Sequence, residues 1–221
     1  MKRLCVIPCR KGSKRIKDKN LKLFLGKPII EYSIEVAEES GFDKILIATD
    51  YRGLRDYEEA KIYRRKEENA QDSSGLKDLV IEILEDEKQK GSLYDSVCIL
   101  YPCAPFVKKE YLIICQNMLE TLDYNTVFPV QKNTSRNKDL YIKNEIYVTS
   151  EVDHDEEDSR RYKHAGMFFY IKTDWLLKGN SIVSGKCGYI ILKEWEAQDI
   201  NTPEDWTMAE IKYNTNLTKI T

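Results

Sequence analysis

Residues 3–8 are Arg-Leu-Cys-Val-Ile-Pro, and residues 9–16, which follow, are Cys-Arg-Lys-Gly-Ser-Lys-Arg-Ile. The first run is short and largely apolar and ends at a proline, which predicts a buried strand. The second run is basic and contains a glycine, where the backbone can approach a ligand closely. A strand that leads directly into such a loop is typical of an α/β protein with a ligand site at one edge of its sheet.

Short apolar runs and helix-like patterns alternate over the first 130 residues. Further strands are predicted at 44–49, 96–101 and 126–130, and helices at 28–40, 52–60, 74–90 and 108–121. Strand–helix alternation with short connections favours a parallel sheet with right-handed crossovers. We therefore predict an α/β fold with a Rossmann-like, mostly parallel sheet and helices on both faces.

The alternation stops at residues 131–165, which are polar and poorly periodic. Two more apolar strands follow at 167–171 and 188–192. A last helix begins at Thr202, a suitable N-cap, with Pro203 at the first helical position. We predict one domain over residues 1–221, from which 131–165 protrudes as a small arm or subunit contact.

The composition narrows the function classes. The chain has 221 residues, of which 42% are hydrophobic and 33% are charged, and its formal net charge is −2. This is enough apolar material for one core, and the charge argues against a general nucleic-acid or membrane coat. No run of about 18 apolar residues exists, and the first apolar run is too short for a secretory signal. We therefore expect a cytoplasmic protein. Its six cysteines form no Cys-x-x-Cys pair, which argues against a zinc site, and three of them lie among apolar residues, which favours buried, reduced thiols.

The charge is nevertheless concentrated near the start of the chain. Residues 1–27 hold ten Lys and Arg residues against one acid, Asp18, so that this part alone carries +9. Backbone N–H groups, a glycine and several cations together suit phosphate. Neither a Walker A motif nor Gly-x-Gly-x-x-Gly is present, which favours a polyphosphate held largely by side chains. A solvated basic face or a nucleic-acid contact is the alternative.

Two other segments carry weaker signals. Asp199 and Asn201 lie between a strand and the last helix, where a carboxylate commonly holds Mg²⁺ beside phosphates; simple capping of that helix is the alternative. Residues 64–75 place cations before a serine-rich helix start, which ordinary capping also explains. His154 and His164 belong to no recognisable catalytic pattern.

The pattern Pro8-x-Arg10-x-Gly12-Ser13-Lys14-Arg15-Ile16-x-x-Lys19-Asn20 resembles the signature of CMP-sialic-acid synthetases, the acylneuraminate cytidylyltransferases. The likeness continues in the same order through residues 26–29, 48–50, 65–70, 101–106 and 199–206. Residues 101–106 and 162–168 are most similar to the pseudaminic-acid cytidylyltransferase branch. The resemblance extends from residue 3 to about residue 213.

The resemblance implies a fold of the nucleotide-diphospho-sugar transferase type. It also implies transfer of CMP from CTP to a nine-carbon 2-keto sugar acid, such as pseudaminic acid, with Mg²⁺ and release of pyrophosphate. The residues it implies are Arg10, Lys19 and Asp199 for catalysis; Arg10, Lys11, Gly12, Ser13, Asn20, Arg65, Ser74 and Tyr101 for the nucleotide; Arg160, Arg161 and Phe168 for the sugar; and Asp199 and Asn201 for the metal. It further implies a homodimer in which the arm over 131–165 reaches the neighbouring active site.

Two positions depart from the family pattern. Asn201 stands where the family has a second metal-binding aspartate, and Tyr101 stands where sialic-acid synthetases have a glutamine that reads the base. These departures leave two alternatives open. One is a catalytically impaired homologue that binds a nucleotide sugar, and the other is a nucleotidyltransferase that acts on a different sugar.

Overall fold

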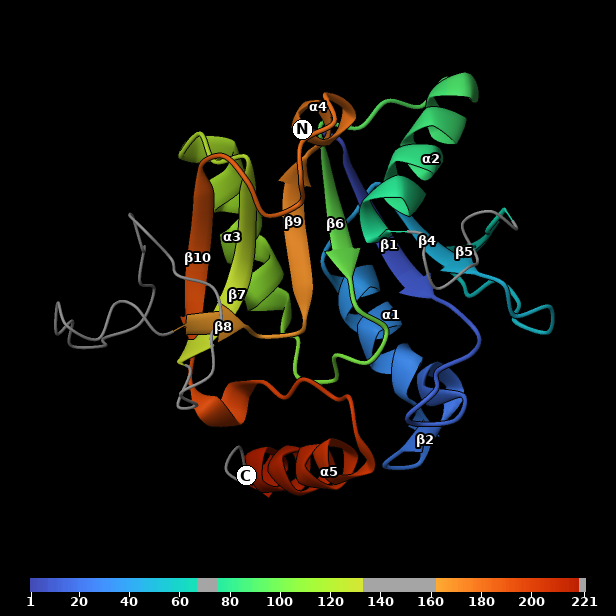
Figure 1. Cartoon of the computed structure of the whole chain (residues 1–221), viewed down its shortest axis with the longest axis vertical. Helices are drawn as coiled ribbons and strands as arrows, with labels where there is room; N and C mark the ends of the chain where they lie inside the picture. Colours follow the sequence, from blue (N-terminus) through green and yellow to red (C-terminus); the bar gives the residue numbers. More distant parts are fainter. Residues whose placement is uncertain (67–74, 133–161, 219–221) are drawn as a thin grey trace, which may run out of the picture.

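The computed structural model describes residues 1–66, 75–132 and 162–218 of the chain. A large mixed sheet in the order β10-β7-β9-β6-β1-β4-β5, with β8 paired to β7, forms its centre (Figure 1). Its strands are β1 (Arg3–Cys9), β4 (Lys44–Thr49), β5 (Ala60–Arg64), β6 (Ser96–Leu100), β7 (Thr126–Lys132), β8 (Tyr162–His164), β9 (Phe168–Lys172) and β10 (Cys187–Leu192). The other elements are the hairpin β2 (Leu23–Phe24) and β3 (Lys27–Pro28), the helices α1 (Ile29–Glu39), α2 (Leu76–Gln89), α3 (Lys109–Thr121), α4 (Thr173–Leu177) and α5 (Pro203–Thr218), and the 3₁₀ turns η1 (Lys19–Leu21) and η3 (Glu194–Glu196).

The strand directions confirm the predicted α/β fold with a mostly parallel sheet. β1 pairs in parallel with β4 and β6, β4 with β5, and β7 with β10. β9 is inserted antiparallel between β6 and β7, and β8 is antiparallel to β7. The carboxyl ends of the parallel strands therefore meet at one edge, at the bottom of Figure 1, where α5 crosses below the sheet.

Helices cover both faces of the sheet, as predicted. Ile30 and Ile34 of α1 and Leu112 of α3 pack on one face, whereas Leu79 and Ile83 of α2 pack with α4 on the other. Within α1 and α2 these side chains lie four residues apart, so each helix turns one apolar stripe to the sheet. Full burial of one such side chain stabilises the fold by about 1.5–3 kcal/mol.

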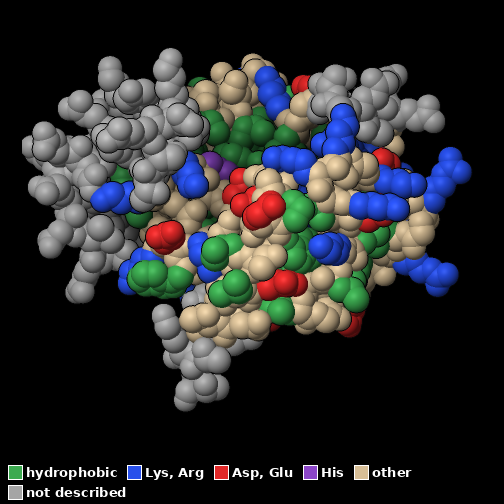
Figure 2. All heavy atoms as spheres, turned by 60° about the horizontal axis from the view of Figure 1, so that its bottom comes forward, with side chains coloured by type: hydrophobic (Ala, Val, Ile, Leu, Met, Phe, Trp, Pro, Cys, Tyr) green, Lys and Arg blue, Asp and Glu red, His purple; other side chains and the backbone are tan. Residues whose placement is uncertain are grey.

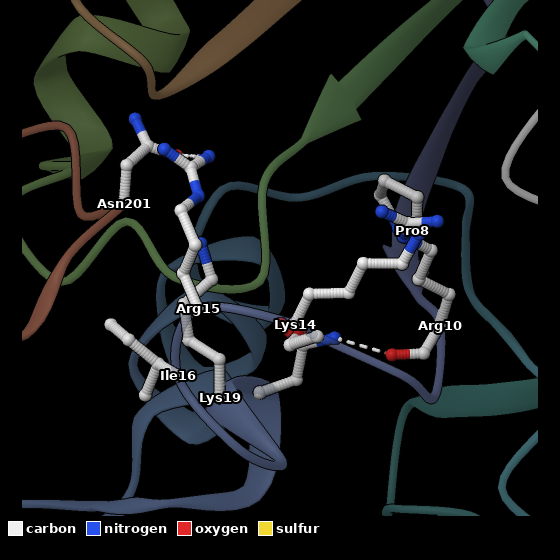
Figure 3. Close-up of a pocket in the computed structure, with 9 residues that line it drawn as sticks. Pro8, Arg10, Lys14, Arg15, Ile16, Lys19 and Asn201 are labelled. Atoms are coloured by element: carbon white, nitrogen blue, oxygen red, sulfur yellow. Dashed lines mark hydrogen bonds between the residues drawn. The ribbon is translucent and has the colours of Figure 1, made fainter.

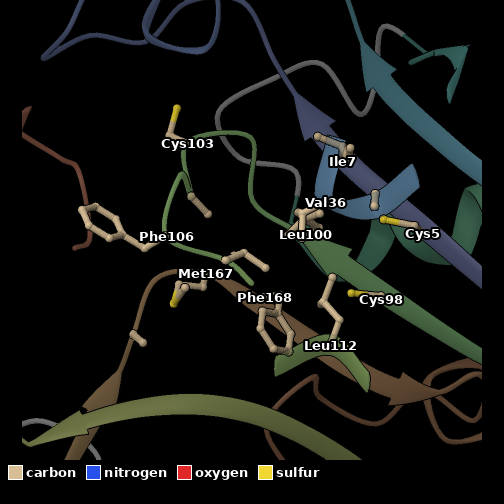
Figure 4. Close-up of a cluster of buried hydrophobic side chains, with 14 of the residues drawn as sticks. Cys5, Ile7, Val36, Cys98, Leu100, Cys103, Phe106, Leu112, Met167 and Phe168 are labelled. Carbon is tan, nitrogen blue, oxygen red and sulfur yellow. The ribbon is translucent and has the colours of Figure 1, made fainter. Parts of the chain in front are cut away.

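The cysteines belong to this core rather than to a metal or disulfide site. Cys5 and Cys98 face each other on β1 and β6 within the cluster shown in Figure 4, and they are fully buried, as is Cys115 of α3. All six cysteines are free. Burial raises the pKa of Cys98 and Cys115 well above the ordinary value, so both remain thiols.

The helix predicted at 52–60 is wrong, because this segment is irregular and leads into the edge strand β5. Side chains take the backbone partners that a helix would use. The Arg64 guanidinium donates to the Tyr51 and Leu54 carbonyls, and the Asp56 carboxylate accepts the N–H of Ile62 at 2.8 Å. Such local side-chain bonds compete with helix formation.

The predicted arm lies mostly outside the described residues. Residues 131–132 and 162–164 of the predicted range belong to the sheet, in β7 and β8. Residues 133–161 are not described, so a protruding arm remains a prediction. No helix among the described residues combines the length and the apolar character needed to cross a membrane.

Candidate active site

A cavity of about 440 Å³ opens at the carboxyl end of β1 (Figure 3). It is lined by Pro8, Arg10, Ser13, Lys14, Arg15, Ile16, Lys19, Asn20 and Asn201. All but one of these residues come from the start of the chain, and the exception follows β10. The fold therefore brings together the basic loop (residues 10–20) and the carboxylate segment (residues 199–201), which the sequence signals had marked separately.

The basic loop is fixed at both of its ends. The N–H of Lys11 donates to Asp50 Oδ1 at 2.5 Å, at the carboxyl end of β4, and Asn20 Nδ2 donates to the Arg10 carbonyl at 3.0 Å. Asn20 is 4% exposed, and its Oδ1 accepts a hydrogen bond from the Cys103 thiol. Gly12 has a φ of +89°, which favours glycine, so the tight turn depends on that residue.

Cations gather on this face of the molecule (Figure 2). Arg10, Lys14 and Arg15 are exposed in the cavity wall, while Lys19 is partly buried and its ammonium donates to the Ile200 carbonyl at 2.6 Å. That bond joins the basic loop to the carboxylate segment. An ammonium has three donors, so two of those on Lys19 remain for a ligand.

In the carboxylate segment, the Asn201 amide bridges a cation and an anion. Arg15 Nη2 donates to Asn201 Oδ1 at 3.2 Å, and Asn201 Nδ2 donates to Asp199 Oδ2 at 2.7 Å; Figure 3 shows Arg15 pointing toward Asn201. A guanidinium only donates and a carboxylate only accepts, so these partners fix the amide orientation. Asn201 therefore turns its oxygen toward Arg15 rather than toward a free position.

The side chains of Asp199 and Asn201 do not cap the last helix. The N-cap of α5 is Thr202, as predicted: the N–H of Asp205 donates to Thr202 Oγ1 at 3.2 Å. In return, Asp205 Oδ2 accepts the N–H groups of Asn201 and Thr202 at 2.9 and 2.8 Å. This reciprocal capping box satisfies the helix start without the side chains of Asp199 and Asn201.

The donor set at Asp199 fits a divalent cation that is held mainly by phosphate. Asp199 is exposed, and within the described part of the chain its Oδ1 accepts no hydrogen bond. The described residues contain no group of three or more His, Cys, Asp and Glu side chains able to hold a metal. A hard cation at Asp199 would therefore take one oxygen from the protein and the others from phosphate and water, which is common for Mg²⁺.

Tyr101 and Arg65 lie near this cavity without lining it. Tyr101 follows β6, and burial together with the Asp199 charge raises its pKa to about 12, so the hydroxyl is protonated at neutral pH. The N–H of Arg65 donates to the Thr49 carbonyl at 3.2 Å. Burial lowers the pKa of Arg65, and the charge of Asp50 partly offsets this. Both residues therefore stand close to the ends of the central strands.

Apart from Tyr101 and Arg65, the predicted site residues fall into three groups. Arg10, Ser13, Lys19, Asn20 and Asn201 line the cavity, Lys11 and Gly12 belong to the same loop, and Asp199 is one hydrogen bond from Asn201. Phe168, predicted to contact the sugar, has no exposed surface: it lies in β9 between two neighbouring strands, and Figure 4 shows its ring inside the apolar cluster. Ser74, Arg160 and Arg161 lie outside the described residues.

Two groups of residues around the site were missed from the sequence. Asp50 was quoted only as part of a motif, although a carboxylate directly after a buried strand is a usable signal in this fold class. Gly166 lies against Asp199, and His164 bonds to Gly166. Both were quoted only within the motif over residues 162–168, and their role was missed because Asp199, which Gly166 contacts, lies far away in the sequence.

The comparisons with known proteins agree with this geometry. A profile of the family described as Cytidylyltransferase matches residues 4–184. The chain is 33% identical to the pseudaminic acid cytidylyltransferase of Campylobacter jejuni subsp. jejuni serotype O:2, with 98% of each chain covered. It is 29% identical to the CMP-N,N'-diacetyllegionaminic acid synthase of Legionella pneumophila, with 95% of each covered. Its fold matches that of CMP:2-keto-3-deoxy-manno-octonic acid synthetase complexed with CTP, with a TM-score of 0.66, 17% identity, and 98% and 100% of the two chains covered.

Proposed function

This chain belongs to the cytidylyltransferase family, and on that ground we propose that it activates a nine-carbon 2-keto sugar acid of the pseudaminic-acid type with CTP. The anomeric hydroxyl of the sugar attacks the α-phosphorus of CTP, the bond from that phosphorus to the β-phosphate oxygen breaks, and pyrophosphate leaves. The hydroxyl proton is released, and the product is the CMP-sugar. The observation that carries the proposal is one cavity in which four cations of the basic loop face the segment that holds Asp199.

The residues of the basic loop suit the binding of a triphosphate. Arg10 and Lys14 line the cavity wall, and Lys19 keeps donors available beside its bond to Ile200. Phosphoryl transfer of this kind depends on positioning and on charge stabilisation more than on covalent catalysis. These cations would hold the phosphates in line for attack and offset the charge that develops on the leaving pyrophosphate.

We assign the divalent cation to Asp199. Enzymes of the cytidylyltransferase family generally depend on a divalent metal. Mg²⁺, when bound, would act as a Lewis acid on the phosphate oxygens. Asp199 Oδ1 would be the protein ligand, whereas Asn201, with its oxygen on Arg15, would orient the carboxylate instead of coordinating the metal.

The bridge through Asn201 also bears on the alternative of an impaired homologue. An aspartate at this position could not donate to Asp199, so Asn201 stabilises a single carboxylate where a pair of acids would repel each other. A single carboxylate remains sufficient when phosphates supply most of the ligands. We therefore favour an active enzyme over a protein that only binds its ligand.

The test is pyrophosphate release with CTP, Mg²⁺ and a panel of acceptors: pseudaminic, legionaminic and N-acetylneuraminic acids and 2-keto-3-deoxy-manno-octonic acid. We expect release with an acceptor of the pseudaminic or legionaminic type. Calorimetry that shows CTP binding without release from any acceptor, at high enzyme concentration, would establish a binding protein instead. Release with the octonic acid alone would overturn the choice of a nine-carbon acceptor.

We further propose that the enzyme is a cytoplasmic homodimer with no nucleic-acid partner. The arm expected over residues 131–165 favours a dimer. Sedimentation equilibrium measures the oligomeric state, and we expect the mass of two chains. Binding to duplex DNA at low salt would contradict the assignment of the basic loop to a nucleotide, because a polyanion would then compete for the same cations.

A further inference from the structure

The turn between β8 and β9 lies directly against Asp199. Gly166 in this turn has a φ of +70°, and a Cβ built on it would stand 2.7 Å from Asp199 Cγ and 2.9 Å from Asp199 Oδ1. Real Cβ atoms essentially never come this close to such atoms. Glycine is therefore required here twice, once for the backbone conformation and once for the space that the carboxylate occupies.

His164 holds this turn in place. The N–H of Gly166 donates to His164 Nδ1 at 3.0 Å, and His164 Nε2 lies 3.2 Å from the Phe168 carbonyl. The first partner can only donate and the second can only accept, so the ring is neutral and carries its proton on Nε2. Its ring stacks on Phe169, with centroids 4.2 Å apart and planes 5° apart.

The neighbouring strands fix the turn further. The N–H of Ala165 donates to the Pro129 carbonyl of β7 at 3.0 Å, and the N–H of Tyr101 donates to the Met167 carbonyl at 2.9 Å. The residues on either side of Gly166 are thus bonded to β7 and to the residue that follows β6. A turn anchored in this way cannot move aside easily if a larger residue is placed in it.

We propose that His164 and Gly166 are positioning residues for the cation site: the turn they form leaves room for the Asp199 carboxylate and keeps its Oδ1 uncovered while Asn201 holds Oδ2. This inference rests on the proposed function, in which Asp199 carries the metal. A methyl group at position 166 would both displace the carboxylate and cover the oxygen that Asn201 leaves open. Loss of the His164 bonds would release the turn that supports this arrangement.

The main test compares Gly166→Ala with Gly179→Ala. Gly179 also has a positive φ, +87°, but a Cβ there would meet nothing within 4 Å. Both changes therefore carry the same kind of backbone strain, and only one meets Asp199. The readout is Mn²⁺ binding to the CTP-saturated protein, followed by electron paramagnetic resonance, alongside CTP affinity without metal and the melting temperature.

We expect Gly166→Ala to weaken Mn²⁺ binding at least tenfold and to raise the Mg²⁺ concentration for half-maximal activity by the same factor. CTP affinity without metal should not change, and Gly179→Ala should bind Mn²⁺ like the unaltered protein. Equal Mn²⁺ affinities in the two alanine variants would overturn the inference. Asp199→Asn is the reference: if it leaves Mn²⁺ binding intact, the cation site of the proposed function is wrong, whereas weak binding there but not in Gly166→Ala rejects only the positioning role.

A pair of His164 variants tests the same inference without a glycine substitution, and decides it alone if Gly166→Ala does not fold. His164→Phe keeps a stacked ring and loses both hydrogen bonds, while His164→Asn keeps an acceptor near the Nδ1 position. We expect weaker Mn²⁺ binding in His164→Phe and substantial recovery in His164→Asn. Unchanged Mn²⁺ binding in both variants would reject the role of His164.

Discussion

The basic loop and the carboxylate segment line the same cavity, but different contacts hold them. The basic loop is closed by Asp50 at the end of β4 and by its own Asn20. The carboxylate segment depends on two remote partners, the Lys19 ammonium and the turn at Gly166, and on the capped start of α5 that follows it. The basic loop is therefore fixed by contacts with the central strands, whereas the position of the carboxylate segment depends on the packing of α5 and of the turn at Gly166. Substitutions should separate phosphate binding from metal binding accordingly.

The largest effect is expected from Trp206→Ala, which removes a buried side chain of α5, the helix that anchors the carboxylate segment. Trp206 is 4% exposed, packs edge-on against Phe24 and donates to Glu210 at 3.0 Å. Its truncation should lower the free energy of unfolding by about 3–5 kcal/mol in urea titrations. Metal-dependent activity should fall further than CTP binding. Trp195→Ala is the control, since Trp195 is 50% exposed and its loss should cost much less. Equal losses of unfolding free energy in the two tryptophan variants would contradict the role of α5 as the anchor of the carboxylate segment.

Arg10→Ala removes a cation from the basic loop. Removing one charge-stabilising donor from a site of this kind lowers kcat by about 10²–10³. We expect that loss in pyrophosphate release, together with weaker CTP binding. Lys17→Ala removes the same charge from the same loop, but Lys17 does not line the cavity. A similar loss in both variants would show that overall charge matters and the cavity geometry does not.

A smaller effect is expected from Thr202→Ala, which removes the N-cap oxygen of α5, next to the carboxylate segment. Loss of an N-cap oxygen destabilises a protein by about 1 kcal/mol. We expect this in thermal unfolding, with a modest rise in the Mg²⁺ requirement because the carboxylate segment adjoins the cap. Thr202→Ser should restore both values. Thr207→Ala, in the same helix, should be neutral, since Thr207 only bonds back to the Pro203 carbonyl.

The smallest effect concerns the stability of the protein at acid pH. It involves Glu87, which lies far from both segments. Burial alone would raise the pKa of Glu87, but hydrogen bonds from Lys44 and Lys90 outweigh it and hold the pKa below the usual 4.5. The stability it contributes is therefore full above pH 4.5 and is lost as the pH falls through the lower folded-state pKa. Glu87→Gln should flatten this part of the pH–stability curve, whereas Glu85→Gln at an exposed position should not. A steep acid limb that survives in Glu87→Gln would assign the sensitivity to other groups.

The sequence predicted what depends on neighbours along the chain. β1 and the basic loop, the apolar stripes of α1 and α2, and the cap at Thr202 all follow from local pattern and were confirmed. The helix expected at 52–60 failed because Arg64 and Asp56 bind the backbone across a turn, a competition that periodicity does not reveal.

Features that join remote parts of the chain could not be predicted. The antiparallel insertion of β9 depends on which strands it meets, and the burial of Phe168 follows from that insertion. Asn201 was recognised as a departure from the family pattern, but its bridge between Arg15 and Asp199 required the fold. The same holds for Gly166 and His164: the motif over residues 162–168 contains both, but the contact between Gly166 and Asp199 required the fold.

The bond from Lys19 to Ile200 spans 181 residues of the chain and has a consequence for biosynthesis. Ribosomes add roughly 5–20 residues per second, so this partner emerges roughly 10–40 seconds after the lysine. During that interval the nascent polypeptide can assemble its first strands, but no reaction centre can exist. A translation product that stops short of Ile200 would also lack α5 and the buried Trp206, so it would be expected neither to complete the site nor to reach the stability of the full chain.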